Sequence, residues 1–299
     1  MPLLDVRGLV KSFVRRHGWR GPATTVRAVD GVSFAIEPGE IFALVGESGS
    51  GKSTTARCVL RLIEPTAGQI MFRGQNLLAL TRDELRQVRR HIQAVFQDPD
   101  GSLNPRLRVS EIVAEPFVVH RIGSKEEQRR RVGALLGLVE LEPSASDRFP
   151  RMFSAGQRQR ISIARALALE PALLVADEPV AALDAPLQVQ IVDLIQDLER
   201  RLDLACLFIT HDLRLVRRIA ARAAVMRLGR IVELAPPAVL FNSPRHPYTQ
   251  ALVAALPSHA STDPWLRETA RKRARPIDWS QADHAAELRE VGPGHWAAL

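Results

Sequence analysis

The sequence lacks the features typical of secreted and membrane-spanning proteins. It has only two cysteines, Cys58 and Cys206, and neither stands in a Cys-x-x-Cys pair or near a histidine cluster. The cysteine pattern therefore indicates neither a disulfide framework nor a zinc site. No stretch approaches the roughly 20 consecutive apolar residues of a membrane-spanning helix. Because Asp5 and Arg7 interrupt the apolar residues near the N-terminus, no signal peptide is predicted, and any membrane contact is expected to be peripheral.

Aromatic residues are also scarce, at 5%, and Tyr248 is the only tyrosine among the 299 residues. The 46% hydrophobic and 25% charged residues are typical of a globular protein. An excess of 41 Lys and Arg over 33 Asp and Glu gives a formal net charge of +8. This charge suits nucleic acid, nucleotide phosphates or an anionic membrane, although a solvated basic surface explains it more simply. Near the arginine cluster of the tail, at residues 267–275, the only aromatic residues for base stacking are Trp265 and Trp279, so no nucleic-acid partner is predicted.

Short apolar runs alternate with amphipathic stretches along the chain. We predict strands at residues 40–45, 172–176 and 204–210, a strand with a turn at 26–36, and helices at 52–63 and 186–202. Strands separated by helices indicate an α/β fold with a mostly parallel sheet. The region from about 98 to 170 is predicted to be an inserted helical subdomain. We therefore expect a domain over residues 1–235 and an extension with a basic tail over 236–299.

The segment GESGSGKST, residues 46–54, matches the phosphate-loop pattern G-x-x-x-x-G-K-[ST] between a predicted strand and a predicted helix. Its glycines let backbone N–H groups surround phosphate oxygens, and the helix N-terminus adds positive potential. Lys52 is expected to reach the β- and γ-phosphates, and Ser53 to bind Mg²⁺. The alternative is an ordinary glycine-rich turn, which this context disfavours. We therefore predict an ATP and Mg²⁺ site with loop contacts from Gly46, Glu47, Ser48, Gly49, Ser50, Gly51, Lys52, Ser53 and Thr54.

Another apolar run ends in two adjacent carboxylates, Asp177 and Glu178. Asp177 is expected to hold Mg²⁺ through water. Glu178 is expected to act as the general base that polarises water in line with the γ-phosphate. Taken alone, such a pair is more often a solvated turn or a helix cap. The phosphate loop upstream favours the catalytic interpretation.

Four further short motifs resemble those of one family of ATPases. The segment FSAGQ at 153–157 resembles the LSGGQ signature of ABC-type ATPases, and residues 182–184 resemble the D-loop. Gln97 in VFQDP resembles the Q-loop glutamine, and His211 in FITHDL resembles the switch histidine. Singly, these residues could be a loop amide, a core histidine or a helix cap. Together with the phosphate loop they make residues 3–256 resemble the ATP-binding domains of ABC transporters.

This resemblance implies a P-loop ATPase of the ABC type that works as a head-to-tail dimer closing over two nucleotides. Ser154, Gly156 and Gln157 would then contact the nucleotide bound mainly by the partner. Within one chain the resemblance implies catalytic roles for Lys52, Glu178, Gln97 and His211, with Gln97 also contacting the metal ion. It also implies that Phe13 stacks on adenine.

The C-terminal region resembles the extension of ATPases that serve dipeptide, oligopeptide and nickel importers, through SPRHPYTQALVAALP and VGPGHWAA (291–298). We interpret its HPYT segment, residues 246–249, as structural. The implied function is ATP hydrolysis that energises uptake of peptides or a related solute. The implied location is peripheral, on the cytoplasmic side of the cell membrane. The implied partners are a second, different ABC ATPase chain, two integral permease subunits and, indirectly, a solute-binding protein.

Two alternatives remain at this point: an accessory ABC ATPase of the phosphonate-breakdown type, and a soluble ABC ATPase acting on nucleic acid. The latter usually has two ATPase domains or a coiled-coil insertion, which this sequence lacks. Two residues also depart from the family pattern. Ala155 replaces the usual signature glycine, which is costly only where φ is positive, and Ala181 replaces a common serine. Because neither alters Lys52, Asp177 or Glu178, the chain's own half of the site is expected to stay competent and the partner's nucleotide to be held less well.

Overall fold

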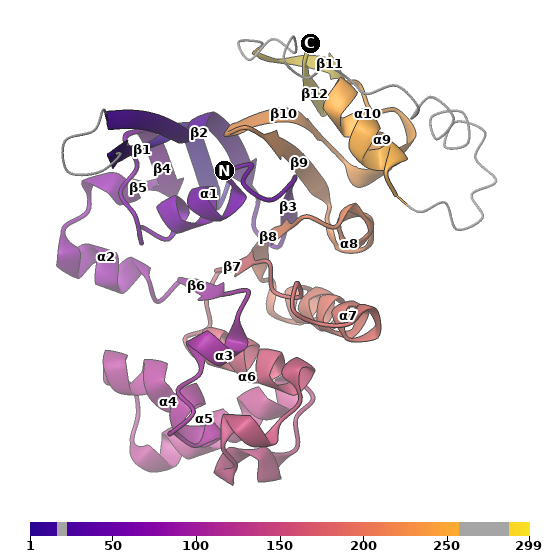
Figure 1. Cartoon of the computed structure of the whole chain (residues 1–299). Coiled ribbons are helices and arrows are strands. Elements are labelled where there is room, and N and C mark those ends of the chain that lie inside the picture. The colour runs from indigo at the N-terminus through magenta and orange to yellow at the C-terminus, as the bar shows by residue number, and fades with distance from the viewer. Residues whose placement is uncertain (17–22, 257–286) are drawn as a thin grey trace.

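The computed structural model describes residues 1–16, 23–256 and 287–299, and in this part of the chain two β-sheets and their covering helices form an α/β architecture (Figure 1). The smaller sheet has the order β2-β1-β4-β5, with β1 Leu4–Arg16, β2 Ala23–Ile36, β4 Ala67–Phe72 and β5 Gln75–Asn76. The larger sheet has the order β11-β12-β10-β9-β3-β8-β7-β6. Its strands are β3 Ile41–Val45, β6 Ile92–Val95, β7 Leu173–Asp177, β8 Ala205–Thr210, β9 Arg222–Arg227, β10 Arg230–Ala235, β11 Leu288–Gly292 and β12 His295–Ala298.

The larger sheet is mixed. Strands β6, β7, β8, β3 and β9 are parallel neighbours, as the alternation of strands and helices predicts. Strands β10, β12 and β11 continue the sheet in antiparallel pairs. The central strands are buried on both faces. Leu173 and Val175 of β7, for example, belong to the core beneath the smaller sheet, whereas Leu174 and Ala176 belong to the core beneath the helices.

The expected turn at Asp30 and Gly31 is wrong. Strand β2 runs through this pair to Ile36 and is antiparallel to β1, with shifts in the register on either side of Leu9. Gly31 has φ of 73°, so the pair is accommodated within an irregular strand pairing and not in a hairpin turn. Such irregularities break the period-two pattern, which is why the sequence did not predict the smaller antiparallel sheet.

The helices are α1 Lys52–Val59, α2 Arg82–Val88, α3 Pro99–Ser102, α4 Val109–His120, α5 Lys125–Leu138, α6 Ala155–Leu167, α7 Ala185–Leu202, α8 Leu213–Ile219, α9 Pro237–Asn242 and α10 Pro247–Ala254. The prediction that the first helix reaches residue 63 is wrong, because Arg61 adopts a left-handed conformation with φ of 48° shortly after the helix ends. Helix α2 starts after Thr81, which forms a complete capping box with Glu84. Ser124 caps α5 through its hydroxyl alone, which accepts from the Glu127 N–H.

Helices α3 to α6 come between β6 and β7 in the chain, and these two strands are neighbours in the sheet. The helices form a separate lobe at the lower end of the molecule in Figure 1. Their apolar side chains, such as Phe117 and Leu136, share one core with α7 and with one face of the larger sheet. The lobe is therefore an insertion that remains packed on the strands from which it leaves.

The region after β10 packs against the opposite end of the larger sheet. Leu240, Phe241 and Tyr248 share a core with Ala43 and Val45 of β3. The hairpin of β11 and β12 pairs with β10 and extends the same sheet. Among the described residues, no helix is both long and apolar enough to span a lipid bilayer.

Candidate nucleotide-binding site

The parallel strands bring the predicted site residues to one edge of the larger sheet. Their registers align the strand ends, with Val45 beside Thr210 and Asp177 beside Ile209. The phosphate loop follows β3, Gln97 follows β6, Glu178 follows β7 and His211 follows β8. The carboxyl edge of a parallel sheet is where α/β proteins place their ligands.

The phosphate loop lies directly on β2 and on the end of β9. A Cβ at Gly46 would come within 2.1 Å of the Met226 carbonyl oxygen, and one at Gly51 within 2.2 Å of the Ala28 carbonyl oxygen. Gly51 also has φ of 106° and precedes α1 as an N-cap without a side-chain hydrogen bond. The helix therefore begins with backbone N–H groups that no capping side chain occupies, which is the arrangement that binds phosphate.

Lys52 is buried, with 3% of its surface exposed. Its ammonium group donates to the carbonyl oxygens of Gly46 and Glu47, both at 2.8 Å. Burial lowers the pKa of Lys52, while the nearby carboxylates of Glu178 and Asp177 oppose that shift. A cation held by neutral carbonyls on the inner side of the loop can move to a phosphate without first breaking an ion pair.

Ser53 and Asp177 form the predicted metal pair. The Ser53 hydroxyl donates to Asp177 Oδ1 at 2.8 Å, although 124 residues separate them. Burial raises the pKa of Asp177, and the Ser53 hydrogen bond and neighbouring cations oppose the shift. A hydroxyl and a carboxylate oxygen at the start of α1 are ligands that suit Mg²⁺ beside phosphate. The residues present therefore fit both groups of the predicted ATP and Mg²⁺ site.

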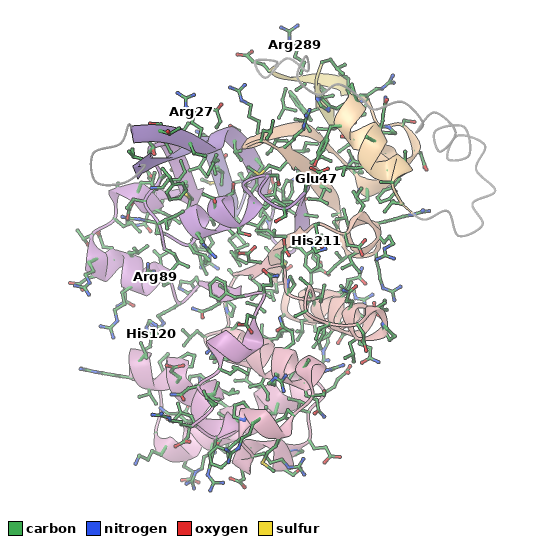
Figure 2. All side chains as sticks on the ribbon, in the orientation of Figure 1. Arg27, Glu47, Arg89, His120, His211 and Arg289 are labelled. Atoms are coloured by element: carbon green, nitrogen blue, oxygen red, sulfur yellow. The ribbon has the colours of Figure 1, made fainter. Side chains whose placement is uncertain are left out.

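Glu178 and His211 meet where β7 and β8 end. His211 Nδ1 lies 3.3 Å from Glu178 Oε2, and the Glu178 N–H donates to the Ile209 carbonyl oxygen. Glu178 has φ of 49°, a left-handed conformation that is uncommon outside glycine and often marks a functional site. The His211 side chain is 57% exposed and Glu178 only 15%, and Figure 2 shows His211 in the middle of the molecule. Gln97 is exposed in the bend after β6.

The signature segment is in the helical lobe. Ser154 caps α6, its hydroxyl accepting from the Gln157 N–H at 3.3 Å while the Gln157 side chain accepts from the Ser154 N–H at 3.0 Å. Ala155 is the first residue of α6 and is not among the residues with positive φ. The alanine therefore fits without the backbone strain that the sequence left open. A cavity of about 300 Å³ lies at this segment and is lined by Glu140, Leu141, Ser154, Gly156, Gln157, Arg160, Leu187, Gln190 and Ile191. None of these lining residues comes from the phosphate loop.

Phe13 is 43% exposed on β1, and the Lys11 ammonium lies 5.0 Å from the centre of its ring. An exposed ring can stack on a base, so its role as the adenine contact stays a prediction. The D-loop aspartate, Asp184, caps α7 by accepting from the Leu187 N–H at 3.1 Å.

One contact of the phosphate loop was missed by the sequence-based interpretation. The Tyr248 hydroxyl accepts a hydrogen bond from the Glu47 N–H at 3.2 Å, across 201 residues. The only hint in the sequence was a single tyrosine placed directly after a proline in the HPYT segment.

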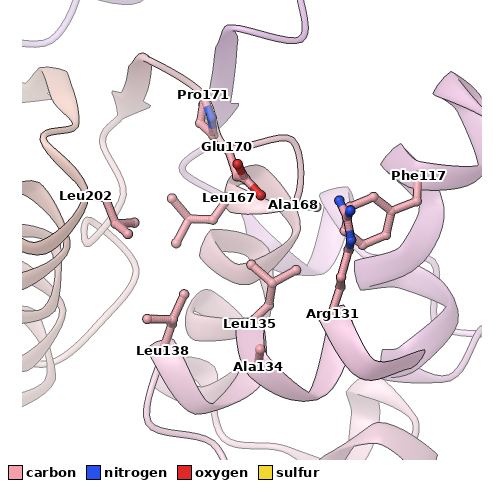
Figure 3. A pocket seen from close by; sticks show the side chains of 10 residues that line it. All are labelled: Phe117, Arg131, Ala134, Leu135, Leu138, Leu167, Ala168, Glu170, Pro171 and Leu202. Carbon is pink, nitrogen blue, oxygen red and sulfur yellow. The ribbon is translucent and has the colours of Figure 1, made fainter. Parts of the chain in front are cut away.

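A second cavity, of about 360 Å³, lies between α5, the end of α6 and the end of α7 (Figure 3). Leu135, Leu167 and Leu202 line it, together with Glu170 and others. None of the predicted site residues is among its lining residues. It is therefore separate from the nucleotide site.

The family model described as ABC transporter matches residues 29–181, and the model described as oligopeptide/dipeptide transporter, C-terminal region, matches residues 232–281. The sequence is 48% identical to a putative peptide import ATP-binding protein of Brucella ovis, over 99% of this chain and 97% of that protein. It is 45% identical to the glutathione import ATP-binding protein GsiA of Salmonella paratyphi A, over 99% of this chain and 48% of that longer protein.

Solved structures agree with these matches. The ATP-binding cassette MJ0796, in a dimeric post-hydrolysis state with ADP and Pi, is 30% identical and covers 78% of this chain and 98% of its own, with a TM-score of 0.69. CbiO1 of Clostridium perfringens, part of the ABC transporter complex cbiONQ, is 28% identical and covers 81% of this chain and 91% of its own, with a TM-score of 0.70. The chain belongs to the ABC transporter family and is one of its ATP-binding, ATP-hydrolysing proteins.

Proposed function

We propose that this ATPase energises the uptake of peptides, or of a related small solute such as glutathione, across the cytoplasmic membrane. The observation that carries the proposal is the combination of an ATPase core with an extension that matches the oligopeptide/dipeptide transporter C-terminal region. Relatives that match almost the whole chain are named for peptide and glutathione import. The comparisons give no support to the phosphonate-type or nucleic-acid-linked alternatives.

In this proposal the residues at the carboxyl edge of the sheet have separate roles in binding the phosphates, holding the metal ion and activating water. Lys52 moves from its carbonyl partners to the β- and γ-phosphates, and the other loop residues from Gly46 to Thr54 cradle the phosphates through their backbone N–H groups. Ser53, Asp177 and Gln97 are the residues that would hold Mg²⁺. When bound, Mg²⁺ offsets the negative charge that the phosphates carry.

Glu178 accepts a proton from the water that attacks the γ-phosphate. His211, 3.3 Å from the Glu178 carboxylate, holds that side chain and contacts the γ-phosphate. Glu178 combines a left-handed backbone with a carboxylate that lies beside His211, at the end of the neighbouring strand. Phe13 stacks on the adenine ring. These roles make residues 1–235 the catalytic unit, with the helical lobe from about 98 to 170 as its movable part and residues 236–299 as the extension.

We further propose that the signature completes a site on another chain. Ser154, Gly156 and Gln157 line a surface cavity without phosphate-loop residues, and the start of α6 favours an anion there. The dimeric state of the related cassette supports a head-to-tail pair. The proposed assembly contains a second, different ATPase chain and two integral permease subunits, and it receives solute from a binding protein. The chain is then peripheral, on the cytoplasmic side of the membrane.

The test is transport by the assembled complex. The chain is co-expressed with candidate permease subunits and a second ABC ATPase chain, reconstituted into lipid vesicles, and supplied with labelled dipeptides, longer peptides or glutathione. We expect ATP-dependent uptake of at least one of these solutes, and recovery of the chain with the membrane fraction only when the permeases are present. Uptake that does not require ATP, or membrane binding without permeases, would contradict the proposal.

A further inference from the structure

The C-terminal extension reaches into the nucleotide site through Tyr248. This side chain is 3% exposed and belongs to α10, yet its hydroxyl accepts from the Glu47 N–H at 3.2 Å. The Arg227 guanidinium lies 5.2 Å from the centre of the tyrosine ring, at the end of β9 on which the phosphate loop also rests. Figure 2 shows Glu47 on the side of the molecule where the extension lies. The extension is therefore part of the support of the phosphate loop.

The hydrogen bonds at Glu47 hold the loop from two directions. Its carbonyl oxygen accepts from Lys52 Nζ at 2.8 Å, while its N–H donates to Tyr248. When Lys52 turns towards a phosphate, the first of these bonds is lost and the bond to Tyr248 remains. The tyrosine can therefore keep the entry to the loop in place while the lysine changes partners.

The tyrosine is itself held by a buried polar network. The Tyr248 N–H donates to His246 Nδ1 at 3.1 Å, which requires that nitrogen to be unprotonated, and burial lowers the pKa of His246. The His246 N–H donates to Glu233 Oε2 at 3.0 Å. Glu233 is fully buried in β10. A buried network with satisfied partners fixes the geometry of its members.

The same carboxylate connects the network to the C-terminal hairpin. Glu233 Oε1 accepts from the Arg245 N–H at 2.7 Å and lies 2.7 Å from His295 Nε2 on β12. Strand β10, the HPYT segment and the hairpin thus converge on one side chain. Because these hydrogen bonds hold the backbone at Tyr248 in place, its hydroxyl is also held in place next to the Glu47 N–H.

We propose that Tyr248 is a positioning residue for the phosphate loop, and that its hydroxyl preorganises the loop for nucleotide phosphates by fixing the Glu47 N–H. Preorganisation increases affinity because less order has to be gained on binding. The inference rests on nucleotide binding by the loop and is independent of the imported solute. It assigns to the extension a role inside the ATP site, in addition to any role in the assembly.

The test is Tyr248→Phe in the full chain, which removes one hydroxyl and keeps the buried ring. We expect the Kd for ATP, measured by calorimetry in the presence of Mg²⁺ under conditions without turnover, to rise about two- to tenfold, the effect of one lost hydrogen bond. The KM for ATP of the assembled ATPase should rise in parallel, with kcat changed by less than about twofold. Amide hydrogen exchange at Glu47 should become faster in the nucleotide-free variant.

Thr249→Val is the matched control. Thr249 is the next residue of α10 and is fully buried, and its hydroxyl has no hydrogen-bond partner within the described residues. Its replacement removes a hydroxyl from the same segment without touching the loop. We expect wild-type values for the Kd, the KM and the exchange at Glu47.

Unchanged ATP affinity and unchanged exchange at Glu47 in Tyr248→Phe would overturn the proposal. So would equal changes in both variants, or a fall in kcat and melting temperature without a change in the Kd, since these would show a merely structural role. A rise in the Kd confined to Tyr248→Phe would support it whether or not the transporter imports peptides.

Discussion

The phosphate-loop end and the signature end of this chain differ in how complete they are. At the first, Lys52 donates to the Gly46 carbonyl oxygen and the Ser53 hydroxyl donates to Asp177. Glu178 and His211 meet at the neighbouring strand ends. At the second, Ser154 and Gln157 only cap each other at the exposed start of a helix. The two ends are separate in the structure, because the signature cavity includes no residue of the phosphate loop.

This difference indicates which functions the single chain can perform. Binding of phosphates and metal depends on groups that tertiary packing has already positioned. In the proposed assembly, the signature would offer a helix N-terminus and a hydroxyl to the nucleotide bound by the partner chain. Substitutions in the phosphate-loop end should therefore abolish ATP hydrolysis at this chain's own site. Substitutions in the signature end should lower ATP hydrolysis only in the assembled dimer.

Replacing Lys52 by alanine should have the largest effect. The cation that meets the β- and γ-phosphates is lost, and we expect the ATPase rate at this site to fall by about 1,000-fold. Turnover by the purified assembly is the measurement, with Lys125→Ala, at the start of α5 in the helical lobe, as the control with wild-type activity. A Lys52 variant that hydrolyses ATP at a near wild-type rate would exclude this role.

Glu178→Gln should separate binding from hydrolysis. The amide cannot accept a proton from water, so turnover should fall by about 100-fold or more while ATP still binds and the closed dimer accumulates. Size-exclusion chromatography with ATP detects the dimer.

The control for Glu178 is Glu170→Gln. Glu170 has almost the same left-handed backbone, with φ of 51° against 49°, but lines the separate cavity in Figure 3. It should retain wild-type turnover. If Glu178→Gln and Glu170→Gln lose turnover equally, the loss does not come from a general base at Glu178, and that assignment is wrong.

Ser154→Ala should lower turnover of the assembly about tenfold, through the loss of one hydrogen bond to the nucleotide of the partner. Binding of ATP to this chain alone should not change. The substitution also removes a helix cap, which costs about 1 kcal/mol of unfolding free energy. Ser124→Ala removes an equivalent cap, since both hydroxyls accept from the third helical N–H at 3.3 Å.

The two serine variants should therefore be destabilised alike in thermal unfolding and differ in the ATPase rate. If Ser124→Ala is as slow as Ser154→Ala, the defect is one of stability. If the isolated Ser154→Ala chain no longer binds ATP, the proposal that the signature acts on the nucleotide of the partner chain is wrong.

Ala155→Gly should have the smallest effect. Because Ala155 already has helical geometry, glycine relieves no strain there and should reduce stability by less than about 1 kcal/mol. We expect turnover within about twofold of wild type. Each site of the proposed dimer combines the phosphate loop of one chain with the signature of the other. Any difference in ATPase rate between the two sites should then come from the partner chain. A severalfold increase in the assembly's ATPase rate would show that the alanine does weaken the partner's site.

Most of the site could be predicted from the sequence because its members are adjacent to short, strongly apolar strands. The glycines and Lys52 are in one nine-residue segment. Asp177 ends a strand of buried residues, and Glu178 follows it directly. The smaller sheet could not be predicted in the same way, because its long strands have shifted registers and a glycine within β2. The end of α1 was misplaced because nothing in the local sequence shows that Arg61 turns left-handed.

By itself, the sequence determined the α/β class, the phosphate loop and the family, since each depends on residues close together in the chain. Only the tertiary structure decided which distant groups meet. Ser53 contacts Asp177 across 124 residues because β3, β8 and β7 are neighbours in the sheet. Tyr248 reaches Glu47 because α10 shares a hydrophobic core with β3 and the HPYT segment is bonded to β10 and β12 through Glu233. Such contacts depend on the order of strands and the packing of helices, and local sequence patterns carry no information about either.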